Sequence, residues 1–160
     1  MTLSPCFNEK QEGIGLLELM LSLAVIAMLL IMATRYYATA HMGEQVNTGA
    51  GIVQALTGAA AQYEAGQGNY SGISLGELFD FGLVPQDICN SSTACNGTLT
   101  SNPWGGGITV TPTNSNAQIV ISLTDIPLQA CTNLNAKLGN QGTVGTCAGA
   151  SSTFTFTPNT

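Results

Sequence analysis

Residues 14–33 read IGLLELMLSLAVIAMLLIMA, an apolar run in which Glu18 is the only charged side chain. A helix of this length is sufficient to cross the hydrocarbon core of a bilayer, which is about 30 Å thick. A charged side chain inside such a span costs roughly 2.5–3.5 kcal/mol on insertion scales, so an intramembrane glutamate indicates a function. The run therefore predicts a membrane-inserted helix in which one carboxylate has a specific role.

The remainder of the 160-residue chain is long enough for one modest domain and carries few charges. Charged residues make up 8% of the chain, against roughly 25% in an average globular protein. Only Lys10, Arg35 and Lys137 are basic, so the chain has no phosphate-binding footprint and we expect no nucleic-acid partner. A surface this poor in charge is typical of exported, sheet-rich proteins.

The segment before the apolar run, residues 1–13, is short and polar (MTLSPCFNEKQEG). Two cleavage positions are compatible with it. A conventional secretory signal would be removed after the apolar run, near Ala38 or Ala40, where small residues follow. The alternative is a cut after Gly13, which leaves the apolar run as the new N-terminus. The membrane-spanning length of the run and the presence of Glu18 favour the second position.

The junction EG/IGLLELMLSLAVIAML resembles the class III leader and N-terminal helix of type IV prepilins. The resemblance implies that a prepilin peptidase cleaves after Gly13 and that Ile14 becomes the N-methylated first residue. Glu18 matches the glutamate that follows four residues later in this family. The polar leader ending in QEG and the non-Phe residue at position 14 resemble the type IVb branch, which includes toxin-coregulated pilus and conjugative thin-pilus subunits. Type II secretion pseudopilins share the same motif.

The second half of the chain extends the resemblance to type IVb pilins. GLVP (82–85), NPWGGG (102–107) and IPLQAC (126–131) follow the order found in the conjugative thin-pilus subunits. In that family a disulfide near the C-terminus encloses a subdomain used in subunit packing. Cys131 and Cys147 occupy the matching positions, so the resemblance implies that they are bridged.

Glu18 has a physical role consistent with this family. Cleavage after Gly13 would create an α-amino group on Ile14 that is largely cationic at neutral pH. A carboxylate in an apolar filament core is tolerated when it is paired, and pairing with the amine of the next subunit would set the axial register. The alternative interpretation is that Glu18 lies at the headgroup level of the membrane and stays hydrated.

Four of the five cysteines lie beyond the apolar run. An even number in the exported part predicts two disulfides formed outside the cytoplasm. Reduced thiols or a zinc site are the alternatives, but no Cys-x-x-Cys pair is present and the single histidine lies far upstream. Four cysteines permit three pairings. We predict Cys89–Cys95 and Cys131–Cys147, which close the two shortest rings.

The pattern of apolar residues predicts one long helix over 14–64, because no proline occurs in it and an apolar stripe continues past the membrane. The stripe consists of Val46, Ala50, Val53, Leu56, Ala60 and Tyr63. Glycines within the stretch lower helix propensity and allow a bend. Ser74 and Glu77 form a capping-box pattern for a short helix. Segments 108–110, 117–123 and 151–157 read as strands, and 127–139 reads as a helix with Pro127 in its first turn.

These elements predict an α+β fold in which a long N-terminal helix, with a membrane-spanning half and an amphipathic half, packs on a small antiparallel sheet. The predicted organisation is a leader at 1–13, a transmembrane and filament-core segment at 14–34, and a periplasmic or extracellular globular domain at 35–160. Trp104 has two interpretations, a core side chain or an anchor for a partner.

No nucleophile, base and orienting group can be assembled from the sequence, so we expect no catalytic, cofactor-binding or metal-binding residues. The predicted function is that of a structural pilin, which forms a homo-oligomeric helical filament with the help of the prepilin peptidase and the pilus assembly machinery. Its location would be the bacterial inner membrane and then the extracellular pilus. The alternatives are a minor pilin, a secretion pseudopilin, or a membrane-tethered periplasmic binding module.

Overall fold

The computed structural model describes residues 15–89, 95, 101–113 and 115–159. The predicted leader and the residues Gly13 and Ile14 lie outside these described ranges. The chain divides into two compact units, Met1–Ala40 and His41–Thr160, and the first helix contributes residues to both. Each unit is described by itself below.

Helix α1 spans Leu16–Gln67, which confirms the long helix predicted from the absence of proline and from the apolar pattern. The glycines inside it do not end the helix; it stops before Gly68, whose φ of +80° is a conformation that favours glycine. Every residue of the predicted apolar stripe is buried, and the buried face also includes Gly49 and Ala59.

The sheet has four antiparallel strands in the order β1-β2-β4-β3. The strands are β1 Ile108–Pro112, β2 Ile119–Pro127, β3 Gly142–Val144 and β4 Ser151–Pro158. Alternate residues point into the core, so that Ile121 of β2 lies opposite Phe156 of β4 and both are buried. This pattern is the period-two alternation from which β1, β2 and β4 were predicted.

Two features of the sheet differ from the prediction. Strand β2 runs past residue 123 to Pro127, because Asp125 adopts a left-handed backbone (φ +56°) and the register shifts between Leu123 and Ile126. This irregularity returns Ile126 to the buried face. In the sequence, the two polar residues Thr124 and Asp125 interrupt the alternation, so the strand was predicted to end before them. Strand β3 was not predicted, because its three residues, GTV, lie in the glycine-rich stretch GNQGTVGT (139–146), which reads as a loop.

The short helices α2 and α4 lie outside α1: α2 precedes the sheet, and α4 connects β2 to β3. Helix α2 spans Leu75–Asp80, and the Ser74 hydroxyl accepts a hydrogen bond from the Glu77 backbone N–H at 3.2 Å, which confirms the predicted N-cap. Helix α4 spans Leu128–Leu138. The placement of Pro127 in its first turn was wrong: Pro127 has ψ 140° and remains the last residue of β2.

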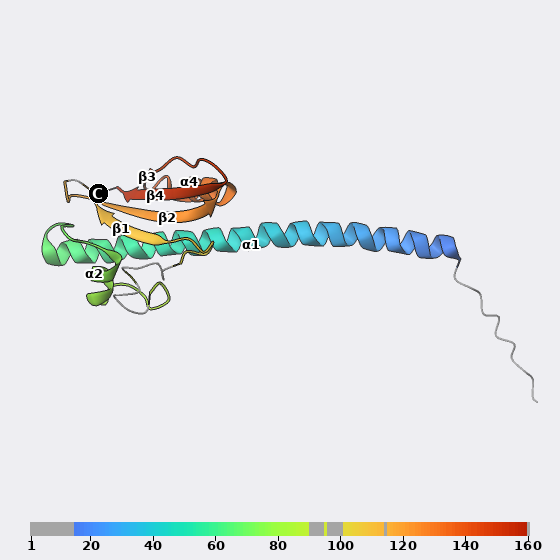
Figure 1. The fold of residues 1–160 in the computed structure, drawn as a ribbon, viewed down its shortest axis with the longest axis horizontal. Helices are drawn as coiled ribbons and strands as arrows, with labels where there is room; N and C mark the ends of the chain where they lie inside the picture. The colour runs from blue at the N-terminus through green and yellow to red at the C-terminus, as the bar shows by residue number, and fades with distance from the viewer. Residues whose placement is uncertain (1–14, 90–94, 96–100, 114, 160) are drawn as a thin grey trace, which may run out of the picture. The chain divides into compact units, whose positions relative to one another are not determined.

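Within the unit formed by residues 41–160, Figure 1 shows the sheet on one side of α1 and α2 on the other. Helix α4 lies beside α1, since the Leu134 side chain approaches Gly49, and Lys137 donates a hydrogen bond to the Asn47 side chain. Apolar side chains from all these elements form one core. The fold is therefore α+β, as predicted.

Candidate assembly surfaces

The apolar N-terminal segment of α1 has its side chains exposed. Residues 15–41 are all exposed, including thirteen large hydrophobic side chains between Leu16 and Met32. Among the described residues, α1 is the one helix long and apolar enough to cross a membrane, with a window of mean hydropathy 2.6. A helix that is apolar on all sides requires a lipid or protein environment around its whole circumference.

The few polar side chains in this segment are satisfied within the helix. The hydroxyl groups of Ser22 and Thr34 donate to the carbonyls of Leu19 and Ile31, at 2.9 and 3.0 Å. A buried hydroxyl without a partner would cost roughly 1–3 kcal/mol, and these local bonds remove most of that cost. Within residues 16–34, where Ser22 and Thr34 are the other polar side chains, Glu18 is the one charged group, and its carboxylate requires a partner when the segment leaves water.

Glu18 lies in the first turn of α1, and its side chain is exposed. Its backbone N–H donates to the Gly15 carbonyl at 2.9 Å. An acidic side chain in the first turn of a helix interacts favourably with the helix dipole. Its predicted partner, the amine of Ile14 in another subunit, belongs to a residue outside the described ranges. The contact between them therefore stays a prediction.

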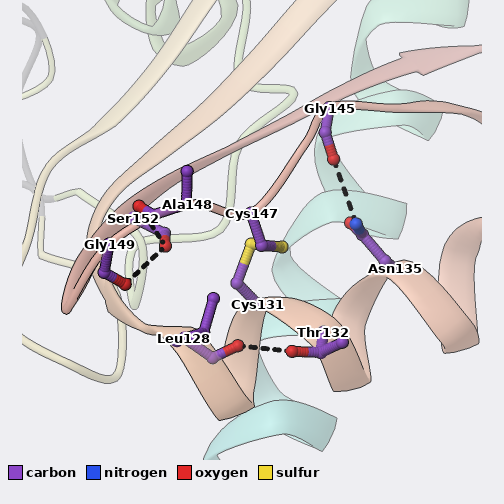
Figure 2. Close-up of a disulfide and its surroundings, with 9 residues drawn as sticks. All are labelled: Leu128, Cys131, Thr132, Asn135, Gly145, Cys147, Ala148, Gly149 and Ser152. Atoms are coloured by element: carbon purple, nitrogen blue, oxygen red, sulfur yellow. Dashed lines mark hydrogen bonds between the residues drawn. A yellow bond between two sulfur atoms is a disulfide. The ribbon is translucent and has the colours of Figure 1, made fainter.

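The second candidate surface is the segment from α4 to the start of β4 (Figure 2). Cys131 of α4 is bonded to Cys147, with a Cα–Cα distance of 5.9 Å. Near this bond the Asn135 amide donates to the Gly145 carbonyl at 3.0 Å, and the Ser152 hydroxyl donates to the Ala148 carbonyl at 3.0 Å. The loop after β3 is thus attached to α4 on one side and to β4 on the other.

The other two cysteines beyond the apolar run are also joined. Cys89 and Cys95 are bonded at a Cα–Cα distance of 5.4 Å, and both are buried at 6% and 5% exposure. Cys95 lies close to Ser74, Leu75 and the residues of β1, because the same small hollow is lined by all of them. This bond therefore closes a small ring in the segment that follows α2, and Cys95 lies near the edge strand β1.

The NPWGGG segment forms a tight turn around Asn102, a role that sequence analysis missed. The Asn102 side chain is buried, at 3% exposure. Its oxygen accepts hydrogen bonds from the backbone N–H groups of Trp104 and Gly106, at 2.9 and 3.1 Å. Its amide donates to the Thr124 carbonyl at 2.7 Å. Asn102 therefore fixes the shape of the turn and attaches it to β2.

The turn places Trp104 against α1, where the helix carries a glycine. A Cβ atom on Gly49 would lie 2.9 Å from Cη2 of Trp104 and 3.0 Å from Cζ3. The Gln45 amide also donates to the Pro103 carbonyl at 3.0 Å. Trp104 is half-buried and packs on the core, so the core interpretation holds for its contacts within the subunit. The pairing of Gly49 with Trp104 had no local signal in the sequence.

The C-terminal end of α1 is attached to the next loop by two tyrosines. The Tyr63 hydroxyl donates to the Ser71 carbonyl at 3.1 Å, and the Tyr70 hydroxyl donates to a Glu64 carboxylate oxygen at 2.7 Å. Burial, together with the hydrogen bond and negative charge of Glu64, raises the pKa of Tyr70 to about 12. The same loop reaches the β1–β2 turn, because the Tyr70 N–H donates to the Asn116 carbonyl at 3.1 Å.

Three features together are those of type IV pilins. The N-terminal part of α1 is apolar and exposed, the rest of α1 packs on a small antiparallel sheet, and a disulfide encloses the segment from α4 to the loop after β3. Residues 44–159 match the family model described as PilS N terminal. This match covers more than half of the chain. The chain therefore belongs to the PilS family and is a pilin of the type IVb kind.

Two relatives with assigned names are similar to most of the chain. The major structural subunit of bundle-forming pilus from Escherichia coli O127:H6 (strain E2348/69 / EPEC) is 29% identical over 134 residues, which cover 82% of this chain and 67% of the relative. The subunit of the same name from Escherichia coli O111:H- matches with the same identity and coverage.

Proposed function

We propose that this chain is the structural subunit of a type IV pilus and polymerises through the exposed apolar part of α1. Its relatives are named as major structural subunits of a pilus, and family membership supports the same role here. The observation that carries the proposal is the set of thirteen exposed large hydrophobic side chains between Leu16 and Met32. Burying each one away from water stabilises by roughly 1.5–3 kcal/mol, which is a large driving force for insertion into the membrane and for keeping the segment out of water in the filament.

Maturation precedes assembly in this proposal. The prepilin peptidase cuts after Gly13, and the new amine of Ile14 is methylated. Until assembly the subunit is held in the inner membrane by residues 14–34, with residues 35–160 on the periplasmic side. The assembly machinery then moves it into the extracellular filament. The EG/I junction and the apolar run behind it support cleavage, methylation and membrane anchoring, and the pilin family supports assembly into a filament.

Glu18 sets the axial offset between neighbouring subunits in the filament. Transfer of the apolar helix from lipid into a bundle of the same helices changes little for the hydrocarbon side chains, but a charged pair can form only at one axial offset. The Ile14 amine of one subunit and the Glu18 carboxylate of its neighbour form this pair. Wrong offsets leave a buried charge without a partner, which costs about 3–5 kcal/mol.

The two bridges, Cys89–Cys95 and Cys131–Cys147, form in the oxidising compartment outside the inner membrane. They hold the outer segments of the globular domain in one arrangement before the subunit enters the filament. The segment between Cys131 and Cys147 is available for subunit packing, as in type IVb pilins that it resembles.

The test is the composition of filaments sheared from the surface of cells that express the chain. Mass spectrometry of the dissociated filament should identify this chain as its main subunit, beginning at Ile14 and carrying one added methyl group. A minor pilin or pseudopilin would be present only in traces, and a tethered binding module would be absent from the filament. Cleavage near Ala40 would remove the apolar helix and refute the proposal.

A further inference from the structure

The apolar segment of α1 is followed by one basic and two aromatic side chains. Arg35, Tyr36 and Tyr37 are consecutive and all exposed, the two tyrosines at 79% and 71%. We call these three residues the interfacial cluster. Aromatic rings this exposed at the end of an apolar run indicate surroundings that are partly apolar and partly polar, because tyrosine has an apolar ring and a polar hydroxyl group.

The position of the interfacial cluster along α1 matches the boundary of a bilayer. At about 1.5 Å per residue, a helix over residues 14–33 is about 30 Å long, which is the thickness of the hydrocarbon core. The cluster follows this run almost at once and therefore falls at the level of the lipid headgroups. Tyrosine is enriched at that level in membrane proteins, and arginine reaches it with the charged end of a long side chain.

The distribution of the cluster around the helix favours lipid over a partner protein. Consecutive helical residues are rotated by about 100°, so the cluster covers about 200° of the circumference of α1. A protein that packs on a helix contacts one face of it, through residues three and four apart. A layer of headgroups surrounds a membrane helix on every side and so contacts all members of the cluster together.

The charge of Arg35 also points to a lipid. The other basic residues of the chain are Lys10, in the predicted leader, and Lys137 of α4. In the proposed orientation Arg35 lies on the exported side, where basic residues next to a membrane span are disfavoured, so topology does not account for it. Residues 41–160 contain six acidic side chains and one lysine. Arg35 is therefore the positive group that an anionic membrane surface meets at this level.

We propose that Arg35 binds the phosphate group of an anionic phospholipid at the exported face of the membrane, with Tyr36 and Tyr37 in the headgroup layer beside it. This inference rests on the proposed function, which places residues 14–34 in the membrane before assembly. A guanidinium group binds a phosphate through two parallel N–H···O bonds, and both partners are charged. The contact holds α1 at one depth in the membrane until the subunit is extracted into a filament.

The composition of the mature chain allows a direct test, because residues 14–160 contain one arginine and one lysine. Isotope-labelled arginine therefore reports on Arg35 alone, and isotope-labelled lysine on Lys137 alone. The mature chain is placed in bilayers of phosphatidylethanolamine and phosphatidylglycerol in phosphate-free buffer. Solid-state NMR then measures the distance from each label to the lipid phosphorus. Lys137 is the matched control, since it donates a hydrogen bond to the Asn47 side chain within the globular unit.

The guanidinium carbon of Arg35 should lie about 4 Å from a phosphorus atom, which is the spacing of a paired guanidinium and phosphate. The Lys137 label should show no phosphorus nearby.

Variants of the mature chain test the role of the charge, by native mass spectrometry from detergent that contains phosphatidylglycerol. Arg35→Gln should lower the fraction of subunits that retain this lipid at least about fivefold, because the charge-assisted hydrogen bonds are lost. Arg35→Lys keeps the charge and should retain more lipid than Arg35→Gln. Lys137→Gln removes the same charge from α4 and should retain lipid as the wild type does. Added inorganic phosphate should not displace the lipid.

Several results would overturn the inference. The Arg35 label could lie no closer to phosphorus than the Lys137 label, Arg35→Gln could retain as much lipid as the wild type or as Arg35→Lys, Lys137→Gln could lose lipid equally, or inorganic phosphate could displace it. None of these results bears on the composition of sheared filaments, so the proposed function would stand. A chain cleaved near Ala40 would contain no arginine, and the absence of any arginine signal would refute the proposed function itself.

Discussion

At the scale of single residues, Tyr70 connects the end of α1 to the β1–β2 turn, because its hydroxyl donates to Glu64 and its backbone N–H donates to the Asn116 carbonyl. Its side chain is 6% exposed and donates to the Glu64 carboxylate at 2.7 Å. Burial of the phenol raises the pKa of Tyr70 to about 12, and the hydrogen bond to Glu64 and the negative charge of that carboxylate add to the rise. The folded-state pKa exceeds the unfolded one, so the stabilisation is complete below pH 10 or so and is lost as the pH rises through about 12.

We predict that Tyr70→Phe lowers the free energy of unfolding by about 1 kcal/mol at neutral pH, because Glu64 loses a hydrogen bond. Between about pH 10 and pH 12 the wild type should lose roughly 2–3 kcal/mol relative to the variant. Urea unfolding of the full mature chain in detergent, followed at several pH values, measures both differences. An unchanged difference between the two chains across this range would show that Tyr70 ionises freely.

Asn102 is the residue on which the shape of the NPWGGG turn depends. Asn102→Ala removes the acceptor of two backbone N–H groups and the donor to Thr124. Because the side chain is buried, these groups lose partners without gaining water, and we expect a loss of about 2–4 kcal/mol. The Trp104 fluorescence spectrum should shift to longer wavelength as the indole becomes hydrated. A spectrum and stability like those of the wild type would contradict this role.

At the scale of secondary-structure elements, α1 contains glycines with different physical roles. A Cβ atom at Gly49 meets the Trp104 ring at 2.9 Å, whereas one at Gly51 meets nothing within 4 Å. Alanine raises helix propensity by roughly 1 kcal/mol at either position. At Gly49 this gain is exceeded by the strain of overpacking, which is about 1–3 kcal/mol.

We therefore predict that Gly51→Ala raises the free energy of unfolding by about 0.5–1 kcal/mol and that Gly49→Ala lowers it by about 1 kcal/mol. Chemical unfolding of the two variants in the same detergent compares them directly. Combining Gly49→Ala with Trp104→Leu should recover the propensity gain, because the clashing ring is then absent. Equal effects of both alanine substitutions would mean that the ring of Trp104 moves aside without strain.

The two disulfides attach different elements and differ in ring size. Cys131 and Cys147 are separated by 16 residues, and Cys89 and Cys95 by 6. Loop-closure entropy predicts a stabilisation of roughly 3 kcal/mol for the larger ring and roughly 2 kcal/mol for the smaller one. Paired serine substitutions, compared by urea unfolding in detergent, should therefore be more damaging at 131 and 147. Peptide mapping that linked Cys89 to Cys131 would overturn the pairing on which this order rests.

The elements that could be predicted from sequence are those whose pattern is local. The stripe from Val46 to Tyr63 repeats at helical spacing, and the alternation in 151–157 repeats at strand spacing, so both were predicted correctly. The extension of β2 to Pro127 depends on the left-handed Asp125, and β3 forms only because β4 is available to pair with it. The turn around Asn102 and its contact with Gly49 depend on tertiary packing, which no local pattern encodes.

At the scale of the whole molecule, one helix carries two surface patterns. Residues 15–41 are exposed on all sides, whereas residues 46–63 bury one stripe in the core of the globular unit. A helix of the first kind depends on its surroundings for stability, and one of the second kind depends on its own sheet. In the proposed function, the first part inserts into the membrane and assembles, and the second part belongs to the globular domain.

Substitutions of Glu18 test whether membrane insertion and filament assembly depend on different features of the helix. Glu18→Ala should leave membrane insertion and leader cleavage intact, and should ease residence in the bilayer because it removes a charge from the apolar segment. Filament assembly should nevertheless fail, since the Ile14 amine would enter the filament core without a counter-charge. Glu18→Gln should fail nearly as completely, because the amide keeps the size and hydrogen bonding of the side chain but not its charge.

The decisive measurement is made on the same cells in two fractions: mature subunit in the membrane, and pili on the surface. Ser22→Ala is the matched control within the segment, because the Ser22 hydroxyl bonds to its own helix at the Leu19 carbonyl and has no need of a partner in another subunit. This control should assemble as the wild type does. Normal piliation of the alanine variant at position 18 would mean that the carboxylate stays hydrated at the membrane surface. The register of the filament would then depend on the packing of apolar side chains alone.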